Sequence, residues 1–126
     1  MRFMTMVKSS ETSGPPPKAL MDAIARLGEE GARAGVMVEI GGLHPSAKGA
    51  LIRVSGGKLT VTDGPFTEAK ELVGGYAVYD VKSKDEAVEW TRRFMELHRE
   101  HWKGWEGETE IRQLFDASDF AAAPCS

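Results

Sequence analysis

One carboxylate in this sequence stands where a general acid or base could act. Asp63 opens the segment Asp-Gly-Pro-Phe, directly after a run, Lys58–Thr62, that alternates as a β-strand does. An aspartate at a strand end, facing a cleft, can transfer a proton if burial raises its pKa or a partner holds it ionised. The segment also suits a plain turn, because Asp bonds nearby backbone N–H groups, glycine relaxes φ and proline fixes it. The sequence leaves both interpretations open.

Three further residues can complete a site around Asp63. Arg53, on the preceding strand, and Lys70, in the following loop, are cations that can hold a carboxylate ionised or bind an anionic substrate. His44 titrates near neutral pH, and a carboxylate in the same pocket would orient it as a base. We therefore expect Asp63 and His44 as the catalytic pair, with Arg53 and Lys70 among the substrate contacts.

Aromatic side chains are the other candidates for substrate contact. Phe66 follows the turn, either as a packing anchor or as part of the site. Tyr76 and Tyr79 share one predicted strand at an odd spacing, so they point to opposite faces, and one hydroxyl can enter a cavity while the other ring packs. Trp102 and Trp105 can line a pocket or cover a dimer contact. We place Phe66 and Tyr76 among the substrate-binding residues.

No metal or cofactor is expected. His98 and His101 lie near a predicted helix end, but no third ligand is evident and zinc motifs use other spacings. Their position beside the helix C-terminus is a sufficient explanation. The paired glycines lack the spacing of a nucleotide cradle, and the Gly-x-Ser-x-Gly pattern of a serine nucleophile is absent. The single cysteine, Cys125, has no neighbour that would lower its pKa.

Composition sets broader limits. The chain has 126 residues, 41% of them hydrophobic and 28% charged, which suits one domain with one core. Its net charge is −3 and its basic residues are interleaved with acidic ones, so a nucleic-acid partner is not expected. No apolar run reaches the roughly 20 residues that span a bilayer, and the first residues lack the apolar core of a signal peptide. We expect a cytoplasmic protein.

The elements that position these residues follow the order β-α-β, hairpin, β-α-β. Periodicity predicts strands at 1–8, 36–43, 76–81 and 109–115, helices at 18–34 and from 84 to about 98–101, and a hairpin of strands 50–55 and 58–62 joined by Gly56-Gly57. Residues 63–75 are expected to be irregular. Ser83 and Glu86 form a capping box before the second helix. Without the hairpin, this is the split βαβ arrangement of ferredoxin-like folds. We predict one α+β domain over residues 1–120 and a flexible tail at 121–126.

Such a fold places both helices on one face of the sheet and leaves the other face to be covered. The first strand carries Met4 and Met6 on the face opposite Phe3, Thr5 and Val7, so both faces are partly apolar. A second copy's sheet is the usual cover, which predicts a homodimer, although a helix or the long loop is an alternative.

Three stretches resemble the YCII-related superfamily, in its DGPF-motif branch. They are "VTDGPFTEAKELVGGYAVYDV" (Val61–Val81), "DEAVEW" (Asp85–Trp90) and "EIRQL" (Glu110–Leu114), in order and at family spacing. The resemblance covers roughly residues 1–120 and implies a dimeric α/β barrel of ferredoxin-like halves. It implies no settled activity. The wider superfamily is similar to muconolactone-isomerase-like barrels, includes a dehydrochlorinase of a chlorinated hydroquinone, and has a proposed catalytic His–Asp pair that cannot be matched to His44. DGPF genes often lie beside alternative sigma factors.

Three hypotheses for function follow. The first is a cofactor-free enzyme that isomerises or eliminates on a small metabolite, with Asp63 as acid or base. The second is a non-catalytic binder of a small molecule, which needs an apolar cavity and does not depend on Asp63. The third is an interaction module for a sigma factor, which needs an exposed apolar patch beyond the dimer contact.

Overall fold

The computed structural model of the chain describes residues 1–66 and 69–122. In chain order its elements are β1 (Arg2–Ser9), the short 3-10 helix η1 (Glu11–Ser13), α1 (Lys18–Arg33), β2 (Met37–Gly42), the 3-10 helix η2 (Ser46–Lys48), β3 (Ala50–Ser55), β4 (Lys58–Asp63), β5 (Leu72–Asp80), α2 (Lys84–His101), β6 (Gly107–Gln113) and α3 (Ala117–Ala122).

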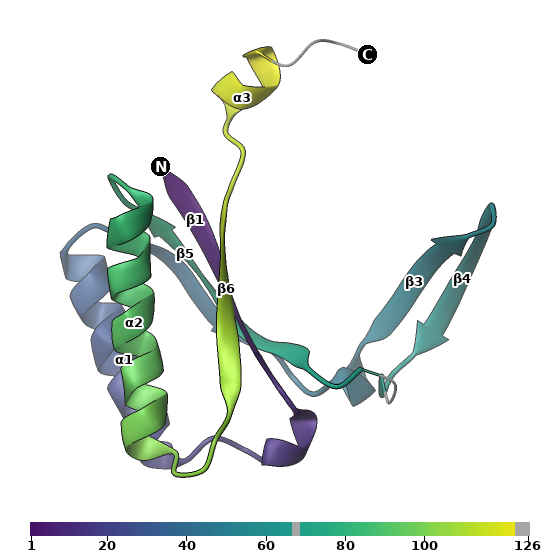
Figure 1. Ribbon diagram of the computed structural model, residues 1–126, viewed down its shortest axis with the longest axis horizontal. Coiled ribbons are helices and arrows are strands. Elements are labelled where there is room, and N and C mark those ends of the chain that lie inside the picture. The colour runs from purple at the N-terminus through teal and green to yellow at the C-terminus, as the bar shows by residue number, and fades with distance from the viewer. Residues whose placement is uncertain (67–68, 123–126) are drawn as a thin grey trace.

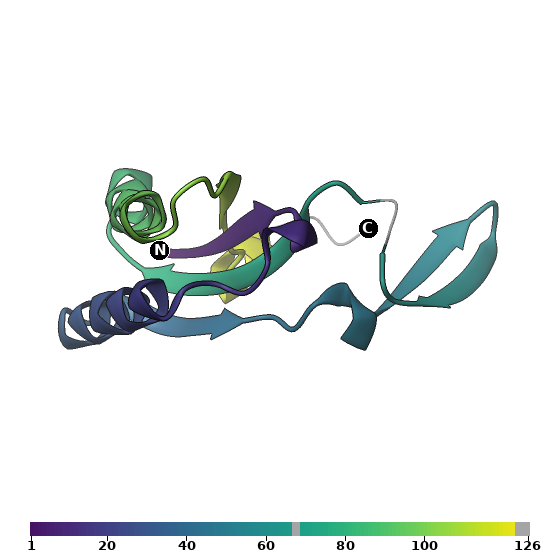
Figure 2. The ribbon, with the colours of Figure 1, turned by 90° about the horizontal axis from the view of Figure 1, so that it is seen from below.

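Four strands form one antiparallel sheet in the order β2-β5-β1-β6. Both long helices lie on one face of this sheet, α1 against β2 and α2 against β1 and β6 (Figure 1). Strands β3 and β4 form a separate two-stranded sheet, which projects from the side of the main sheet opposite the helices (Figure 2). The predicted ferredoxin-like α+β fold with an inserted hairpin is therefore confirmed.

The core lies between the sheet and α2. Phe3 and Tyr79 are paired across β1 and β5 and point toward the helices, where they are 3% and 2% exposed. Tyr79 stacks on Trp90 of α2 with ring centroids 6.2 Å apart, and Ala87 and Val81 fill the same cluster. These aromatic rings supply most of the apolar area that this small core removes from water.

The two helices begin and end much as the sequence predicts. The Ser83 hydroxyl caps α2 by accepting a hydrogen bond from the Glu86 amide at 3.1 Å, and the Glu86 carboxylate accepts one from the Lys82 amide. Gly35, one residue after the C-cap of α1, has φ = +75°, a conformation that favours glycine. No helix in residues 1–66 and 69–122 is long and apolar enough to cross a membrane.

Two predicted strands had wrong boundaries, and one helix was not predicted. Strand β5 begins at Leu72 instead of residue 76, because Gly74 and Gly75 belong to the strand; a β-carbon on Gly75 would lie 3.2 Å from the Gly41 carbonyl oxygen of β2, so glycine allows the close approach. The last strand spans Gly107–Gln113 instead of 109–115. Helix α3 was not predicted, and of the expected tail, residues 123–126 with Cys125 lie outside the described residues.

Candidate functional site

A cavity of about 1220 Å³ lies between α1, the helix-covered face of the sheet and the second half of α2. Its size exceeds the roughly 300–1,000 Å³ typical of small-ligand sites. The side chains that line it are mainly apolar; they include Val7, Leu20, Ile24, Met37, Ala77, Tyr79, Phe94, His98, Trp102 and Trp105. The loops at residues 9–16 and 43–45 border the same space. The fold thus provides one large apolar cavity with few polar groups.

His98 is one of the most buried polar groups of this cavity, together with Thr5, Tyr79 and Thr91. It is 5% exposed, and its Nδ1 lies 3.0 Å from the Phe94 carbonyl oxygen. Because a carbonyl only accepts hydrogen bonds, Nδ1 carries the proton and donates it, which leaves Nε2 with a free lone pair. Burial lowers the pKa of His98, opposed in part by the bond to Phe94, so the ring is neutral at neutral pH.

Nε2 of His98 is open to the cavity. It makes no hydrogen bond within the described residues, and the one fully enclosed polar side-chain atom without a partner there is Nε1 of Trp105. Because His98 Nε2 is neither hydrogen-bonded nor fully enclosed, a ligand in the cavity can reach it. Aromatic rings flank the imidazole on both sides, with centroids 4.6 Å away at Phe94 and 4.6 Å away at Trp105. This end of the cavity therefore offers a hydrogen-bond acceptor between flat apolar surfaces.

Two further aromatic residues shape the cavity. Trp102 stacks on Trp105 with centroids 5.9 Å apart, and a β-carbon on Gly107 would lie 2.4 Å from the Trp105 ring, so glycine lets the indole lie flat on β6. Burial raises the pKa of Tyr79 to about 12, so its hydroxyl stays protonated. The described lining of the cavity includes the carboxylates of Glu11, Glu29 and Glu39 but no Lys or Arg.

Tyr76 borders the cavity from the edge at β2. Its hydroxyl donates to Glu39 Oε1 at 3.0 Å, and this carboxylate raises the pKa of the phenol. A β-carbon on Gly41 would lie 2.8 Å from the Tyr76 ring, so the ring lies across the glycine. Register places Tyr76 and Tyr79 on opposite faces of β5, as predicted. Of the expected substrate contacts, Tyr76 is thus beside the cavity with its hydroxyl already engaged.

The segments that carry the two expected catalytic residues touch, because Gly64, next to Asp63, packs on Ser46, two residues after His44. His44 is exposed in the loop after β2 and borders the cavity. Asp63 is exposed at the end of β4, opposite Ala50, and is absent from the cavity's described lining. Among the described residues its carboxylate makes no hydrogen bond or ion pair. The structure therefore does not bring Asp63 and His44 into one pocket.

Arg53 and Lys70 are also exposed and are not on the described lining of the cavity. Arg53 lies in the middle of β3, opposite Thr60, and Lys70 lies just before β5. Neither residue forms an ion pair within the part of the chain that the structure describes. The expected anion-binding pair and the cavity are separate features of the molecule.

The Asp-Gly-Pro-Phe segment instead joins the hairpin to the body of the protein. The Gly64 amide donates to the Gly49 carbonyl oxygen at 2.9 Å, and the Phe66 amide donates to Ser46 Oγ at 2.9 Å. A β-carbon on Gly64 would lie 1.6 Å from the Ser46 carbonyl oxygen, which leaves no room for a side chain. The Phe66 ring lies against Gly49, where a β-carbon would approach it to 3.4 Å. Glycine at position 64 is therefore required by packing.

Ser46 connects this segment to the loop before α1. It is 8% exposed, and its amide and hydroxyl donate to the two carboxylate oxygens of Glu11 at 2.5 and 2.8 Å. The same hydroxyl oxygen accepts the bond from the Phe66 amide, so all of its hydrogen-bonding capacity is directed to holding the chain. We call Glu11, Ser46, Gly64 and Phe66 the hairpin base.

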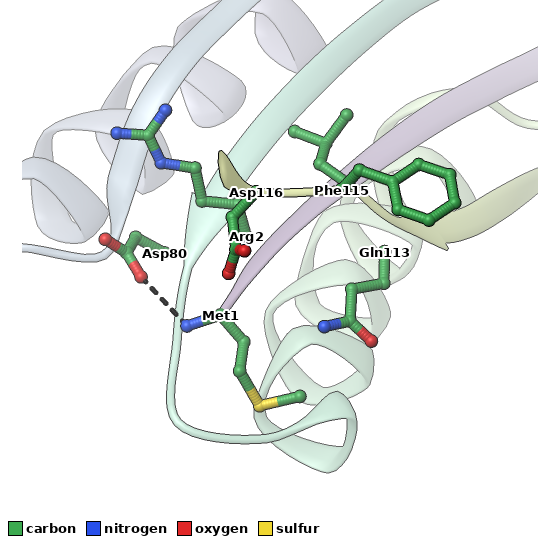
Figure 3. Close-up of a pocket in the computed structure, with 7 residues that line it drawn as sticks. Met1, Arg2, Asp80, Gln113, Phe115 and Asp116 are labelled. Atoms are coloured by element: carbon green, nitrogen blue, oxygen red, sulfur yellow. Dashed lines mark hydrogen bonds and ion pairs between the residues drawn. The ribbon is translucent and has the colours of Figure 1, made fainter. Parts of the chain in front are cut away.

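A second, smaller pocket of about 220 Å³ lies at the opposite end of the sheet (Figure 3). The Met1 amino group lies 3.3 Å from Asp80 Oδ1 there, and both groups are about half exposed, at 45% and 52%. Exposed pairs of this kind are worth only about 0–1 kcal/mol. No group of three or more metal-ligating side chains occurs in residues 1–66 and 69–122. The large cavity is therefore the stronger candidate site.

Sequence reasoning missed His98 as a cavity residue. Its place near the end of α2 was explained by a favourable position beside the helix C-terminus. Helical spacing contained the better indication, because Trp90, Phe94 and His98 are four residues apart and so continue one stripe. A histidine in register with two partly buried aromatic residues is directed to the core side of its helix.

The fold and site define a ferredoxin-like α+β protein with a large, mainly apolar cavity between its sheet and helices. A model of the YCII-related domain matches residues 1–101, and the chain belongs to that family. Over 59 residues, 47% of this chain, it is 39% identical to an uncharacterized protein of Rhizobium meliloti (strain 1021). The aligned stretch spans 48% of that protein, about half of its length. Membership in the DGPF-motif branch stays a prediction from the sequence.

Proposed function

We propose that this YCII-related protein binds a small, largely apolar molecule in the cavity between α1, α2 and the sheet. The observation that carries the proposal is the combination of an apolar cavity with one open hydrogen-bond acceptor, His98 Nε2, set between the Phe94 and Trp105 rings. Apolar sites with a few placed polar groups are the usual form of small-ligand sites.

The chemistry of the cavity also defines the class of ligand. A neutral imidazole with a free lone pair pairs with a hydrogen-bond donor, such as a hydroxyl group. Flat aromatic walls favour a planar ring stacked between them. An anionic group would lose its hydration in this apolar space without an opposite charge to compensate it, because the described lining has no Lys or Arg. We therefore favour a neutral ring compound that carries a hydroxyl group.

Binding has better support than catalysis at Asp63. Proton transfer by Asp63 would need a pocket and a partner within hydrogen-bond reach, and Asp63 lies exposed outside the described lining of the cavity. Of the residues expected to form the active site, His44 and Tyr76 border the cavity, while Arg53, Phe66 and Lys70 do not. An enzyme built on Asp63 and His44 remains the alternative, and it would require a pocket that both residues line.

Two partners expected from the sequence are proposals as well. A second copy is supported by the partly apolar sheet face opposite the helices, where Met4, Met6 and Val78 are partly exposed. A sigma-factor interaction needs an exposed apolar surface, and the hairpin offers one.

Ligand-induced thermal shifts test the proposed binding. We expect neutral phenols and cyclic alcohols to raise the melting temperature, and their carboxylate analogues to have little effect, because the cavity lacks a compensating cation. His98→Phe retains an apolar ring but removes the acceptor, so the apparent affinity for hydroxylated compounds should fall by about tenfold or more, the equivalent of one hydrogen bond.

Two matched variants separate the alternatives. His101→Phe changes the neighbouring histidine at the end of α2, and Asp63→Asn removes the carboxylate of the alternative enzyme; both should bind as the original protein does. If Asp63→Asn abolishes binding while His98→Phe does not, the site lies at the hairpin base and the proposed cavity site is wrong.

A further inference from the structure

The hairpin of β3 and β4 is an arm with one apolar face. Its register pairs Ile52 with Val61 and Val54 with Leu59, so these four side chains share one face. They are 67%, 63%, 71% and 68% exposed, respectively. The opposite face carries the pair Leu51 and Thr62 together with polar residues. Ile52, Val54, Leu59 and Val61 are called the arm's apolar face below.

This face requires a cover. An isolated two-stranded hairpin is at best marginally stable in water, and monomeric proteins rarely leave a large contiguous apolar patch exposed. Every residue of β3 and β4 is exposed, so the body of the same chain does not provide the cover. The alternation of apolar and polar residues along both strands is the pattern of strands that are buried on one face.

The base holds the arm in one direction. Gly64 is bonded to Gly49, and Phe66 is bonded to Ser46, which Glu11 ties to the loop before α1. Both ribbon views place the arm on the side of the main sheet opposite the helices (Figures 1 and 2). A body that lies against the uncovered sheet face is therefore on the same side as the arm.

We propose that the arm's apolar face docks on a second copy of this chain, with each copy's arm reaching the sheet face of the other that its own helices leave open. Symmetry supports this occupant, because the same chain carries both an exposed apolar arm and a sheet face that its own helices leave open.

The area that two arms can bury fits a stable dimer. The four side chains of one apolar face expose on the order of 500 Å², so two reciprocal arms and the surfaces they cover amount to about 2,000 Å², within the range of stable interfaces. A two-fold arrangement uses each surface twice, which is how most homodimers are built. This inference specifies the geometry of the homodimer proposed above and is independent of the ligand.

A charge-neutral pair of substitutions tests the arm. Val54→Glu with Leu59→Lys places opposite charges directly across the hairpin, which keeps the arm paired but makes its apolar face polar. Sedimentation equilibrium of the full chain should give a dimer whose dissociation constant rises by about 100-fold or more in this variant. The matched control, Leu51→Glu with Thr62→Lys, makes the same change on the other face and should alter the dissociation constant by less than about threefold.

The outcomes are distinct. A monomer for the original protein overturns both the homodimer and the arm. A dimer that Val54→Glu/Leu59→Lys leaves unchanged overturns the arm alone and leaves a sheet-to-sheet dimer. Neither result affects the thermal-shift test of the cavity, because the arm's apolar face does not line it.

A second measurement, photo-crosslinking, detects the contact of the arm directly and needs no variant that disrupts the interface. A photo-crosslinking phenylalanine analogue at Leu59, in a mixture of isotopically light and heavy copies, reports what lies over the arm. Crosslinks from a light copy to β1 or β5 peptides of a heavy copy support the proposal. Crosslinks confined to one copy, or a capture of other proteins in place of the second copy, overturn it.

Discussion

The main sheet and the hairpin arm are both antiparallel, and in both the side chains alternate between two faces. Helices cover one face of the main sheet, whereas both faces of the arm are exposed. In β1 and β5, Phe3 and Tyr79 are 3% and 2% exposed beneath α2. In β3 and β4, Val54 and Leu59 hold equivalent cross-strand positions and are 71% and 68% exposed. Alternation therefore identifies which side chains share a face, while the cover of that face depends on elements elsewhere in the chain or in a partner.

The largest expected effect compares one residue from each region. Tyr79→Ala removes a buried ring stacked on Trp90 and should lower the free energy of unfolding by about 3–5 kcal/mol. Leu59→Ala removes an exposed side chain and should change it by less than about 0.5 kcal/mol in the dilute monomer. Urea denaturation at low protein concentration measures both.

Protein concentration sharpens this comparison. Because the arm is proposed to be buried in a dimer, the loss in free energy of unfolding caused by Leu59→Ala should grow as the protein concentration rises. The loss caused by Tyr79→Ala arises in the core of one chain and should not grow in this way. A large, concentration-independent loss for Leu59→Ala would show that the arm packs on its own chain.

Much of this contrast was predictable from residue patterns. The alternation of Lys58–Thr62 and the pair Gly56-Gly57, whose φ values are +57° and +78°, predicted the hairpin and its tight turn. Its isolation was not predictable, because no local pattern shows how far an inserted element stands from the sheet. The role of Gly64 was hidden for the same reason: its contact with Ser46 joins segments that only the fold brings together.

The candidate site also has a part that the sequence predicted and a part that only the fold shows. Asp63 and Arg53 were chosen for residue type and closeness in sequence, but they lie on the arm and outside the described cavity lining. His98 was visible through helical spacing from Trp90 and Phe94, yet its meaning depends on the Phe94 carbonyl and the Trp105 ring beside it. The sequence shows the chemistry that each side chain can perform, but it does not show which side chains line the same pocket.

A smaller effect is expected at the hairpin base. Gly64→Ala places a β-carbon where the Ser46 carbonyl oxygen lies, and neither backbone segment can yield without moving the arm. We expect a loss of about 1–3 kcal/mol and faster hydrogen exchange of the Gly64 and Phe66 amides. Gly74→Ala is the control, since a β-carbon there meets no atom within 4 Å. Equal exchange rates in the two variants would contradict a packing role for Gly64.

The smallest expected effect is a pH dependence of the free energy of unfolding, which arises from His98 between the sheet and the helices and not from the arm. Burial lowers the pKa of His98 in the folded protein below its ordinary value near 6.5. As the pH falls through 6.5, the unfolded chain therefore binds a proton at this residue before the folded protein does. The free energy of unfolding is then highest above that pH and falls on acidification, by at most about 1.4 kcal/mol per pH unit for one proton, until the folded pKa is also passed.

Urea denaturation from pH 7.5 to 5 measures this effect, with His98→Gln as the comparison. Glutamine does not titrate, so the difference between the two proteins isolates the His98 contribution from that of the carboxylates, which dominate at lower pH. The slope of the original protein should exceed that of His98→Gln between about pH 6.5 and 5, whereas Leu59→Ala should retain the original slope. Equal slopes for His98→Gln and the original protein would mean that the His98 imidazole is solvated in the folded protein. That result would contradict the role of Nε2 as a hydrogen-bond acceptor inside the cavity.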